Sequence, residues 1–205
     1  MEEISQQKNG LCVNLKTRRI IRACVATHVF GHPVDMDPIM KIAKIHNLKV
    51  IEDCAEAHGV EYKNKKVGSI GDIGAFSFFA NKIATSGEGG IILTNDDKLA
   101  DKCKYYKNLC FPLNGQRNFI HEDIGYNYRM SNLAAAIALA QVEKLDELVG
   151  LRKNNNHLYR KFLEDVPGIT FQPEKIWAKN VYWMNAIVFA SGIGDVYNKP
   201  DINFL

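Results

Sequence analysis

Lys82 is the residue of this sequence whose surroundings best suit covalent chemistry. It follows the nearly uninterrupted apolar run 74–80 and precedes the glycine-rich turn 87–90. The run predicts a strand covered on both faces, which would end close to Lys82. Burial favours the uncharged form of a lysine, and the free amine is the form that attacks a carbonyl to make a Schiff base. We therefore expect a nucleophile, although most lysines that follow a strand are simply solvated.

Two other side chains would complement such an amine. Ser77 precedes Lys82 by five residues, so its hydroxyl could hold a phosphate while Lys82 holds the aldehyde of the same cofactor. Asp53 closes the run 48–53 (LKVIED) and is expected at the carboxyl end of a strand, where open α/β sheets bind ligands. A carboxylate there can pair with a pyridinium nitrogen, as pyridoxal phosphate requires. Taken alone, Asp53 is equally well interpreted as the cap of a turn.

Composition excludes several classes of partner. The chain has 205 residues, 46% of them hydrophobic, and a net charge of +3. Its basic residues are dispersed among acidic ones, so we expect no nucleic acid and no membrane as partner. An acidic, polar opening and the absence of long apolar runs predict a cytoplasmic location. The cysteines are odd in number and lack metal-binding spacing, so reduced thiols are expected.

The first half of the chain is expected to alternate strands and helices. Residues up to about 16 show no periodicity and are predicted to be irregular, and 20–29 is predicted to be a strand. Asp37 and Pro38 indicate the start of a helix that buries Ile39, Ile42, Ala43 and Ile45. With the strand 48–53 this helix completes a βαβ unit. A hairpin over 60–67 and a strand over 90–94 follow.

The second half is expected to be mainly helical. A helix capped by residues 95–97 should reach Lys107 and bury Leu99, Cys103 and Tyr106, and the loop 109–123 is a candidate lid or dimer arm. Ser131 is predicted to cap a long helix, bent at Gly150 and continuing to about 165. Its apolar stripe comprises Leu133, Ala134, Ile137, Ala140, Leu145 and Leu148. A strand is expected over 181–189, and no pattern is found in 191–205.

His28 and His32 flank a predicted loop and are possible metal ligands. No third ligand has suitable spacing, so histidines that pack or close a turn are favoured.

Three separated motifs occur in a recognisable order: Glu52–Gly59 (EDCAEAHG), Phe76–Gly90 (FSFFANKIATSGEGG) and Gly125–Met130 (GYNYRM). Together they resemble the DegT/DnrJ/EryC1/StrS aminotransferases. The resemblance covers about residues 20–188 and implies an α/β chain of fold-type I. It would comprise a partial pyridoxal-phosphate-binding large domain (1–150), with helices on both faces of an incomplete sheet, and part of a small α+β domain (151–205). Residues 31–39 look most like the perosamine synthase branch.

The resemblance assigns roles to individual residues. Lys82 would form the Schiff base with pyridoxal phosphate and then move a proton, Asp53 would pair with the ring nitrogen, and Ser77 would bind the phosphate. Glu56 would lie near the ring. Asn127 would reach the phosphate of the neighbouring subunit's cofactor, in a homodimer that shares its sites. Arg129 is a weaker candidate that would only buttress its loop.

The implied reaction transfers an amino group from glutamate to a keto-sugar nucleotide, such as GDP-4-keto-6-deoxymannose. A related branch has histidine at the Schiff-base position and dehydrates its substrate, so Lys82 favours transamination. An inactive scaffold that only dimerises is the alternative. A Rossmann-type nucleotide module is weak, because no GxGxxG follows a strand.

The family usually has further segments before Ile20 and after Val188. Those segments ordinarily supply a helix N-terminus for the phosphate and an aromatic residue that stacks on the ring. We therefore expect this chain to bind pyridoxal phosphate weakly, to turn over little, and to expose apolar surface at the sheet.

Overall fold

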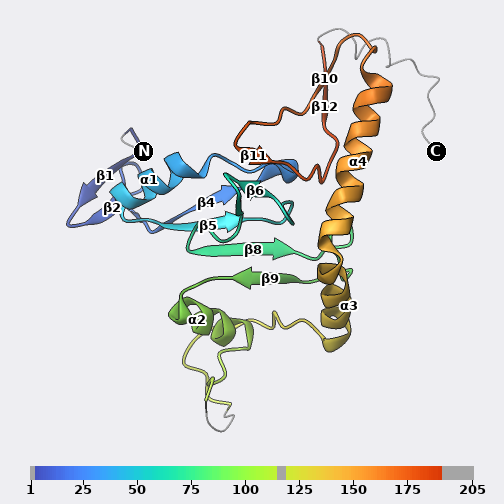
Figure 1. Ribbon diagram of the computed structural model, residues 1–205. Helices are drawn as coiled ribbons and strands as arrows, with labels where there is room; N and C mark the ends of the chain where they lie inside the picture. Colours follow the sequence, from blue (N-terminus) through green and yellow to red (C-terminus); the bar gives the residue numbers. More distant parts are fainter. Residues whose placement is uncertain (1–2, 115–118, 191–205) are drawn as a thin grey trace, which may run out of the picture.

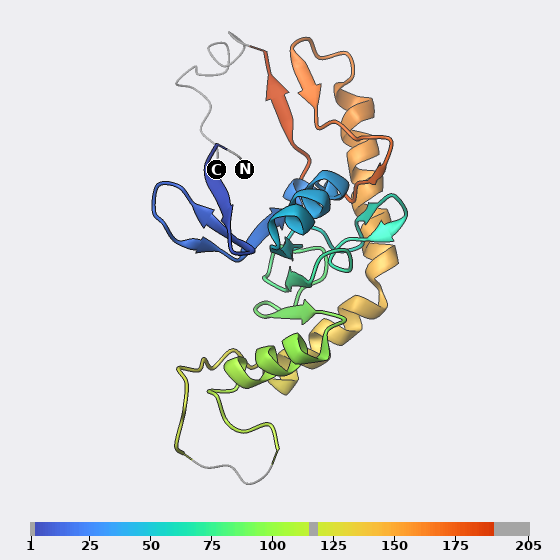
Figure 2. The same ribbon diagram turned by 90° about the vertical axis from the view of Figure 1, so that its left-hand side faces the viewer.

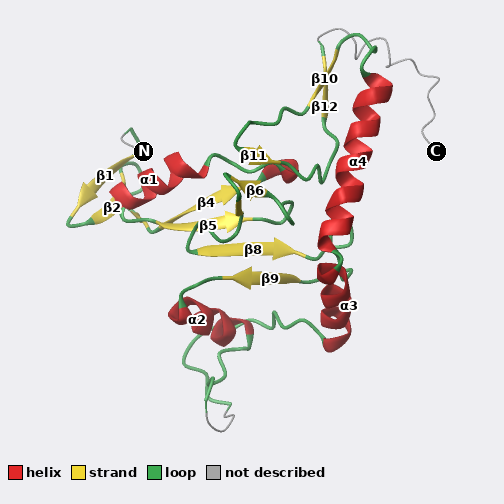
Figure 3. Ribbon diagram, in the orientation of Figure 1, coloured by secondary structure: helices red, strands yellow, loops and turns green. Residues whose placement is uncertain are grey.

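The computed structural model describes residues 3–114 and 119–190 (Figure 1). At its centre is a four-stranded sheet in the order β4 (Ala23–Thr27), β5 (Lys49–Asp53), β8 (Ile73–Ser77) and β9 (Gly90–Leu93). The first three strands are parallel, and β9 pairs antiparallel to β8. The arrows of β4, β5 and β8 all point toward the helical column formed by α3 (Asn132–Glu143) and α4 (Leu145–Leu163) (Figure 3). The carboxyl ends of the parallel strands therefore share one edge of the sheet.

The expected βαβ unit is present, because α1 (Met36–His46) connects the parallel strands β4 and β5. The N-cap residue is Asp35, two residues before Asp37, where the cap was expected, and Pro38 lies in the first turn. Its predicted apolar face is only partly correct. Met36 and Ala43 are buried, whereas Ile42 is 42% exposed and Ile45 is 62% exposed.

The prediction of an irregular N-terminal segment was wrong. β1 (Ser5–Lys8) and β2 (Leu11–Asn14) form an antiparallel hairpin, and β3 (Ile20–Ile21) extends it. Asn9 and Gly10 both have positive φ (51° and 74°), the geometry of a two-residue hairpin turn for which Asn-Gly is favoured. In Figure 2 this hairpin projects from the central sheet. The expected strand 20–29 is thus divided at Arg22 between two sheets.

The long helix predicted after the central sheet is broken at a different residue than expected. Ser131 caps α3, and its hydroxyl accepts the Ala134 N–H at 3.2 Å. The break between α3 and α4 falls at Lys144, whereas Gly150 is helical. Ala138 of α3 belongs to the apolar cluster of Phe78, whereas Val149 of α4 packs on the main core, and Leu145 at the start of α4 contacts both clusters. Most of the predicted stripe on α3 faces outward: Leu133 is 81% and Ile137 53% exposed.

The helix α2 (Asp97–Lys107) begins as predicted. Asp96 is its N-cap and accepts the N–H groups of Lys98 and Leu99. Its predicted burial was wrong, because no residue of α2 is fully buried and Tyr106 is 40% exposed. In Figure 1, α2 lies next to β9, at the edge of the sheet.

The remaining strands are short. The predicted hairpin is formed by β6 (Glu61–Tyr62) and β7 (Lys65–Lys66), and β11 (Ala178–Lys179) adds to β6. Glu61 binds both Lys66 and Lys179, which lowers the pKa of its carboxyl to about 2. The predicted strand 181–189 is reduced to β12 (Ile187–Phe189), because Tyr182 has φ 51°, and β12 pairs with β10 (Ile169–Phe171).

The main core lies between the sheet, α1 and the start of α4, and the segment 178–183 contributes Val181 and Trp183 to it. A single turn of 3₁₀ helix (Val29–Gly31) lies between β4 and α1. The division of domains at residue 150 stays a prediction: β10 and β12 form a sheet of their own, whereas β11 joins the sheet of β6 and β7. Within the described ranges, no helix has the length and apolar character needed to cross a membrane.

Candidate active site

Lys82 lies in the loop between β8 and β9. The loop is held closed by backbone hydrogen bonds, among them Lys82 N–H to the Phe79 carbonyl at 3.0 Å, and by a bridge between Phe79 and Gly87. β8 ends at Ser77, so the lysine follows the strand by one tight turn rather than ending it. Its side chain is partly exposed, and Nζ lies 4.1 Å from the centroid of the Trp183 ring.

Asp53 is the last residue of β5, as predicted. It pairs with Thr27 of β4 on one side and Ala75 of β8 on the other. Its Oδ1 accepts the Ala55 N–H at 3.1 Å, which fixes the carboxylate at the end of the strand. The side chain is partly exposed, so this carboxylate remains accessible.

Ser77 ends the neighbouring strand, two residues beyond the partner of Asp53. Its Oγ accepts the Phe79 N–H at 3.2 Å and thereby shapes the turn toward Lys82. The structure thus places Asp53 and Ser77 at the same edge of the sheet. Ser77 directly precedes the loop that carries Lys82.

Glu56 follows Asp53 in the turn after β5. Its Oε2 accepts the N–H of Phe30 at 2.8 Å. Phe30 has φ 56°, a left-handed conformation that is uncommon for a bulky residue. In this structure Glu56 stabilises that strained turn, and its predicted contact with a cofactor ring is untested.

Asn127 contacts other residues than Asp53, Ser77 and Lys82. It forms a bridge with Asn108, and its Oδ1 accepts the side-chain Nε–H of Arg129 at 3.0 Å. Arg129 therefore makes the contact expected of a residue that buttresses the loop. None of the hydrogen bonds of the described residues joins Asn127 to Asp53, Ser77 or Lys82.

A buried histidine near this site escaped prediction. His58 is 4% exposed, and its ring lies between Phe76 and Phe78, with centroids 5.5 and 5.8 Å away. Within the described residues neither ring nitrogen has a hydrogen-bond partner. Burial, and secondarily the charge of Lys82, lowers the pKa of His58 to about 4. Its place in the motif with Asp53 was the available signal, but its burial depends on the phenylalanines of β8.

The histidines considered as metal ligands have structural roles. His28 and Glu52 form a buried pair, and with Cys54 they bring three possible ligand atoms within 4.8 Å of one another. Glu52, however, already accepts N–H groups from Gly68, Ile70 and Gly71, so its oxygens are occupied. Burial raises the pKa of the Cys54 thiol, which disfavours a thiolate ligand.

His32 is engaged in packing instead. Its Nε2 accepts the Lys175 N–H at 3.1 Å, and its ring contacts Trp177 edge-on.

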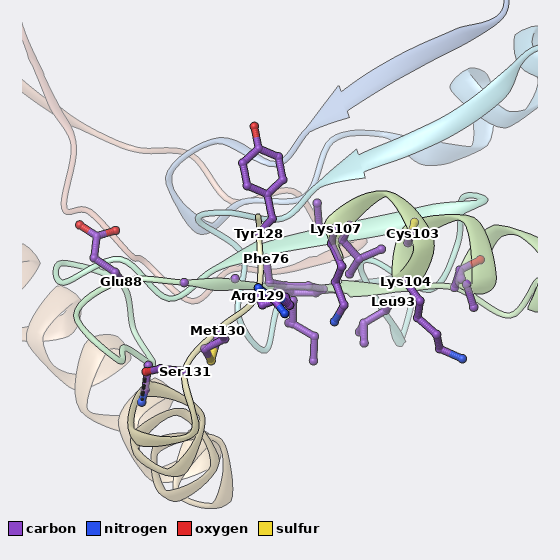
Figure 4. Close-up of a pocket in the computed structure, with 18 residues that line it drawn as sticks. Phe76, Glu88, Leu93, Cys103, Lys104, Lys107, Tyr128, Arg129, Met130 and Ser131 are labelled. Carbon is purple, nitrogen blue, oxygen red and sulfur yellow. Dashed lines mark hydrogen bonds between the residues drawn. The ribbon is translucent and has the colours of Figure 1, made fainter. Parts of the chain in front are cut away.

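A separate cavity lies beside β9. It has a volume of about 840 Å³ and is formed by β9, α2 and residues 128–134. Figure 4 shows Phe76, Leu93 and Met130 lining it together with the basic residues Lys104 and Lys107. Asp53, Ser77 and Lys82 do not line it. Ile91 and Ile92 of β9 are 45% and 52% exposed, which agrees with the expectation of uncovered apolar surface at the sheet.

Comparison with known proteins supplies the family. Residues 6–196 match the sequence model of the DegT/DnrJ/EryC1/StrS aminotransferase family. The chain belongs to this family. Members similar to it include GDP-perosamine synthase of Escherichia coli O157:H7, 42% identical over 82% of this chain and 45% of the relative. Another is a putative pyridoxal phosphate-dependent aminotransferase, EpsN, of Bacillus subtilis (strain 168), 33% identical over 84% of this chain and 44% of the relative.

Solved structures of the family agree with the fold. Helicobacter pylori PseC, an aminotransferase involved in pseudaminic acid biosynthesis, superposes with a TM-score of 0.79 at 28% identity, over 86% of this chain and 47% of that one. DesV of S. venezuelae, solved with a ketimine intermediate, gives a TM-score of 0.75 at 29% identity, over 84% of this chain and 46% of DesV. The α/β fold of fold-type I is thereby confirmed. This family member spans less than half the length of the curated relatives that it matches.

Proposed function

We propose that this chain carries the lysine-bearing part of a pyridoxal-phosphate-dependent sugar-nucleotide aminotransferase. The observation that supports this most strongly is the placement of Asp53 and Ser77 at the carboxyl ends of adjacent parallel strands, beside the loop of Lys82. An amine, a carboxylate and a hydroxyl are the groups that an aldehyde, a pyridinium nitrogen and a phosphate require. The donor set therefore fits the cofactor.

Each side chain would have a separate task. Lys82 would hold the aldehyde through its amine and, when free, would carry a proton to and from the reacting carbon. Asp53 would favour a proton at the ring nitrogen, Ser77 would donate its hydroxyl to the phosphate, and Glu56 would bind near the ring. When bound, pyridoxal phosphate supplies the electron sink that makes an amino acid's α-proton removable.

Asn127 would act on the site of a neighbouring subunit. Its contacts in this chain are with Asn108 and Arg129, which leaves it separate from the Lys82 loop. A homodimer with shared sites would bring it to the phosphate of its partner's cofactor.

The relatives support a proposal for the substrate class. The named function of the similar proteins is GDP-perosamine synthesis, which supports a 4-keto sugar nucleotide such as GDP-4-keto-6-deoxymannose as amino acceptor. Glutamate is the proposed donor, and a cytoplasmic location is part of the same proposal. A catalytically inactive scaffold that only dimerises is the second candidate.

Covalent trapping of the cofactor tests the proposal. The purified chain is mixed with pyridoxal phosphate and reduced with borohydride, and the modified lysine is located by peptide mass spectrometry. We expect the adduct on Lys82 and its loss in Lys82→Ala, with no loss in Lys65→Ala, an exposed lysine of β7. An adduct spread over surface lysines and unchanged in Lys82→Ala would contradict an enzymatic site and favour the scaffold.

A further inference from the structure

Trp183 and Lys82 are far apart in the sequence and in direct contact in the structure. The Lys82 Nζ lies 4.1 Å from the centroid of the indole ring, well within the range of a cation–π interaction. Tryptophan is the aromatic side chain that attracts cations most strongly. In the part of the chain that the structure describes, Lys82 forms no ion pair with a carboxylate. The indole is therefore the group that faces its charge.

The indole is held in place from two sides. Its Nε1 donates to the carbonyl oxygen of Asn81 at 2.9 Å, so the ring is tied to the residue directly before the lysine that it faces. On the other side it stacks on Phe30, with centroids 6.4 Å apart and planes inclined by 30°. Only 6% of Trp183 is exposed. A ring fixed in this way can determine where a flexible side chain comes to rest.

The backbone of Trp183 is positioned as closely as its ring. The Val181 N–H donates to the Gly31 carbonyl at 3.0 Å. A Cβ at Gly31 would lie 2.8 Å from the Trp183 nitrogen, a contact too close for any side chain. The segment 181–183 is thus packed directly on the turn after β4, and Trp183 enters the main core there. Small movements of this segment are resisted by backbone contacts.

We propose that Trp183 is a positioning residue for Lys82: its ring face binds the lysine ammonium and holds the side chain at the carboxyl end of β8, ready for a carbonyl compound. This assignment rests on the proposed function of Lys82. Reaction with a carbonyl requires the neutral amine, which has no charge for the ring to attract. Trp183 therefore holds the waiting lysine and releases it when the amine reacts.

The same position of Lys82 has an electrostatic consequence. Besides burial, the nearby positive charge of Lys82 lowers the pKa of the buried His58 ring.

Ring-current shifts test the contact without any cofactor. Lysines of the complete chain are methylated with ¹³C-formaldehyde and a mild reductant, which leaves each amine as a dimethylammonium cation that still binds aromatic faces. Methyl groups above an indole face resonate upfield of those on solvated lysines. We expect one such upfield resonance, absent in Lys82→Ala and therefore assigned to Lys82.

Three tryptophan variants separate the ring from general packing. Trp183→Leu should move the Lys82 resonance to the position of the solvated lysines, and Trp183→Phe should retain a smaller upfield shift. The matched control is Trp177→Phe, whose ring packs on His32 and Tyr62 and should leave the resonance unchanged. A residue that only fills the core would not shift a lysine methyl group.

The outcomes are decisive in both directions. If Trp183→Leu does not fold, nuclear Overhauser contacts between the Lys82 methyl groups and the indole protons of the unsubstituted chain decide the question. A Lys82 resonance that coincides with those of solvated lysines, or that does not move in folded Trp183→Leu, overturns the proposal. Trapping with pyridoxal phosphate is scored separately. A shifted resonance without an adduct would reject the enzymatic role of Lys82 and leave the contact standing.

Discussion

The Nε2 of His28 lies 3.2 Å from the Oε2 of Glu52, and neither side chain has any exposed surface. The His28 Nδ1 accepts the Val34 N–H at 3.1 Å, so its Nε2 carries the proton and donates to Glu52. Glu52 also accepts the N–H groups of Gly68, Ile70 and Gly71. This pair ties the ends of β4 and β5 to the turn before β8, directly beside Asp53.

Glu52→Gln is predicted to destabilise the chain strongly. Burial alone would raise the pKa of Glu52, but hydrogen bonds from His28 and from the three amides outweigh burial and lower it. An amide has one acceptor oxygen and would direct its NH₂ group at backbone donors. Removing one partner of a buried pair typically costs about 3–5 kcal/mol. Urea unfolding of the purified chain measures the loss.

The matched control for this variant is Lys63→Ala. Lys63 pairs with Asp37 on the surface, where both side chains are more than half exposed. Exposed ion pairs contribute little to the free energy of unfolding, so the urea midpoint of Lys63→Ala should hardly differ from that of the unsubstituted chain. The contribution of Glu52 to stability also depends on pH. Because its pKa is lower in the folded chain than in the unfolded chain, Glu52 stabilises the fold fully above its unfolded pKa. This stabilisation is lost as the pH falls through its folded pKa. Equal midpoints for Glu52→Gln and the unsubstituted chain at neutral pH would refute the role of the pair.

Protonation of His58 is predicted to destabilise the folded chain. Its pKa is lowered from 6.5 to about 4, so the unfolded chain binds this proton more readily than the folded chain does. Stability from this histidine is therefore complete above about pH 6.5 and lost progressively toward pH 4. This difference between the unfolded and folded pKa values corresponds to a loss of about 3 kcal/mol in the free energy of unfolding.

Urea midpoints measured from neutral pH down to about pH 4 test this prediction. His58→Leu should remove the part of the acid sensitivity that lies in this window, whereas His157→Leu, at an exposed position of α4, should retain it. Identical pH profiles for His58→Leu and the unsubstituted chain would show that His58 is not buried in its neutral form.

Asp53→Asn should separate cofactor binding from catalysis. The neutral amide still occupies the end of β5, but it no longer favours a proton on the ring nitrogen. We expect pyridoxal phosphate to be trapped on Lys82 as before, and exchange of the glutamate α-proton with deuterated water to slow by orders of magnitude. Near-normal exchange would exclude the pairing of Asp53 with the ring.

Subunit complementation tests the shared site. If Asn127 acts on its partner's cofactor, a mixed dimer of Lys82→Ala and Asn127→Ala chains concentrates both lesions in one site and leaves the other intact. Mixing the two inactive variants should therefore restore part of the activity. The mixture of Lys82→Ala with Asp53→Asn is the control, because both residues lie in the same chain's site and no intact site results. Failure to complement would indicate self-contained sites.

The sequence by itself determined the family and the local order of the site. Apolar runs that end at Asp53 and before Lys82 predict strands from neighbouring residues alone, and parallel strands bring their carboxyl ends together. The Ser131 cap and the hairpin at 60–67 were likewise readable from local chemistry. The Asn9-Gly10 turn carried an equally local signal, yet this segment was predicted to be irregular because it shows neither helical nor strand periodicity.

The tertiary structure alone decided which side chains the core covers and which distant residues meet. The exposure of Ile42, Ile45 and Ile137 depends on what packs against each helix, which the periodicity of a helix does not reveal. The contact of Trp183 with Lys82 arises because the segment 181–183 packs on the turn at Gly31, and no spacing in the sequence encodes it. Such contacts form between segments that only the folded chain brings together.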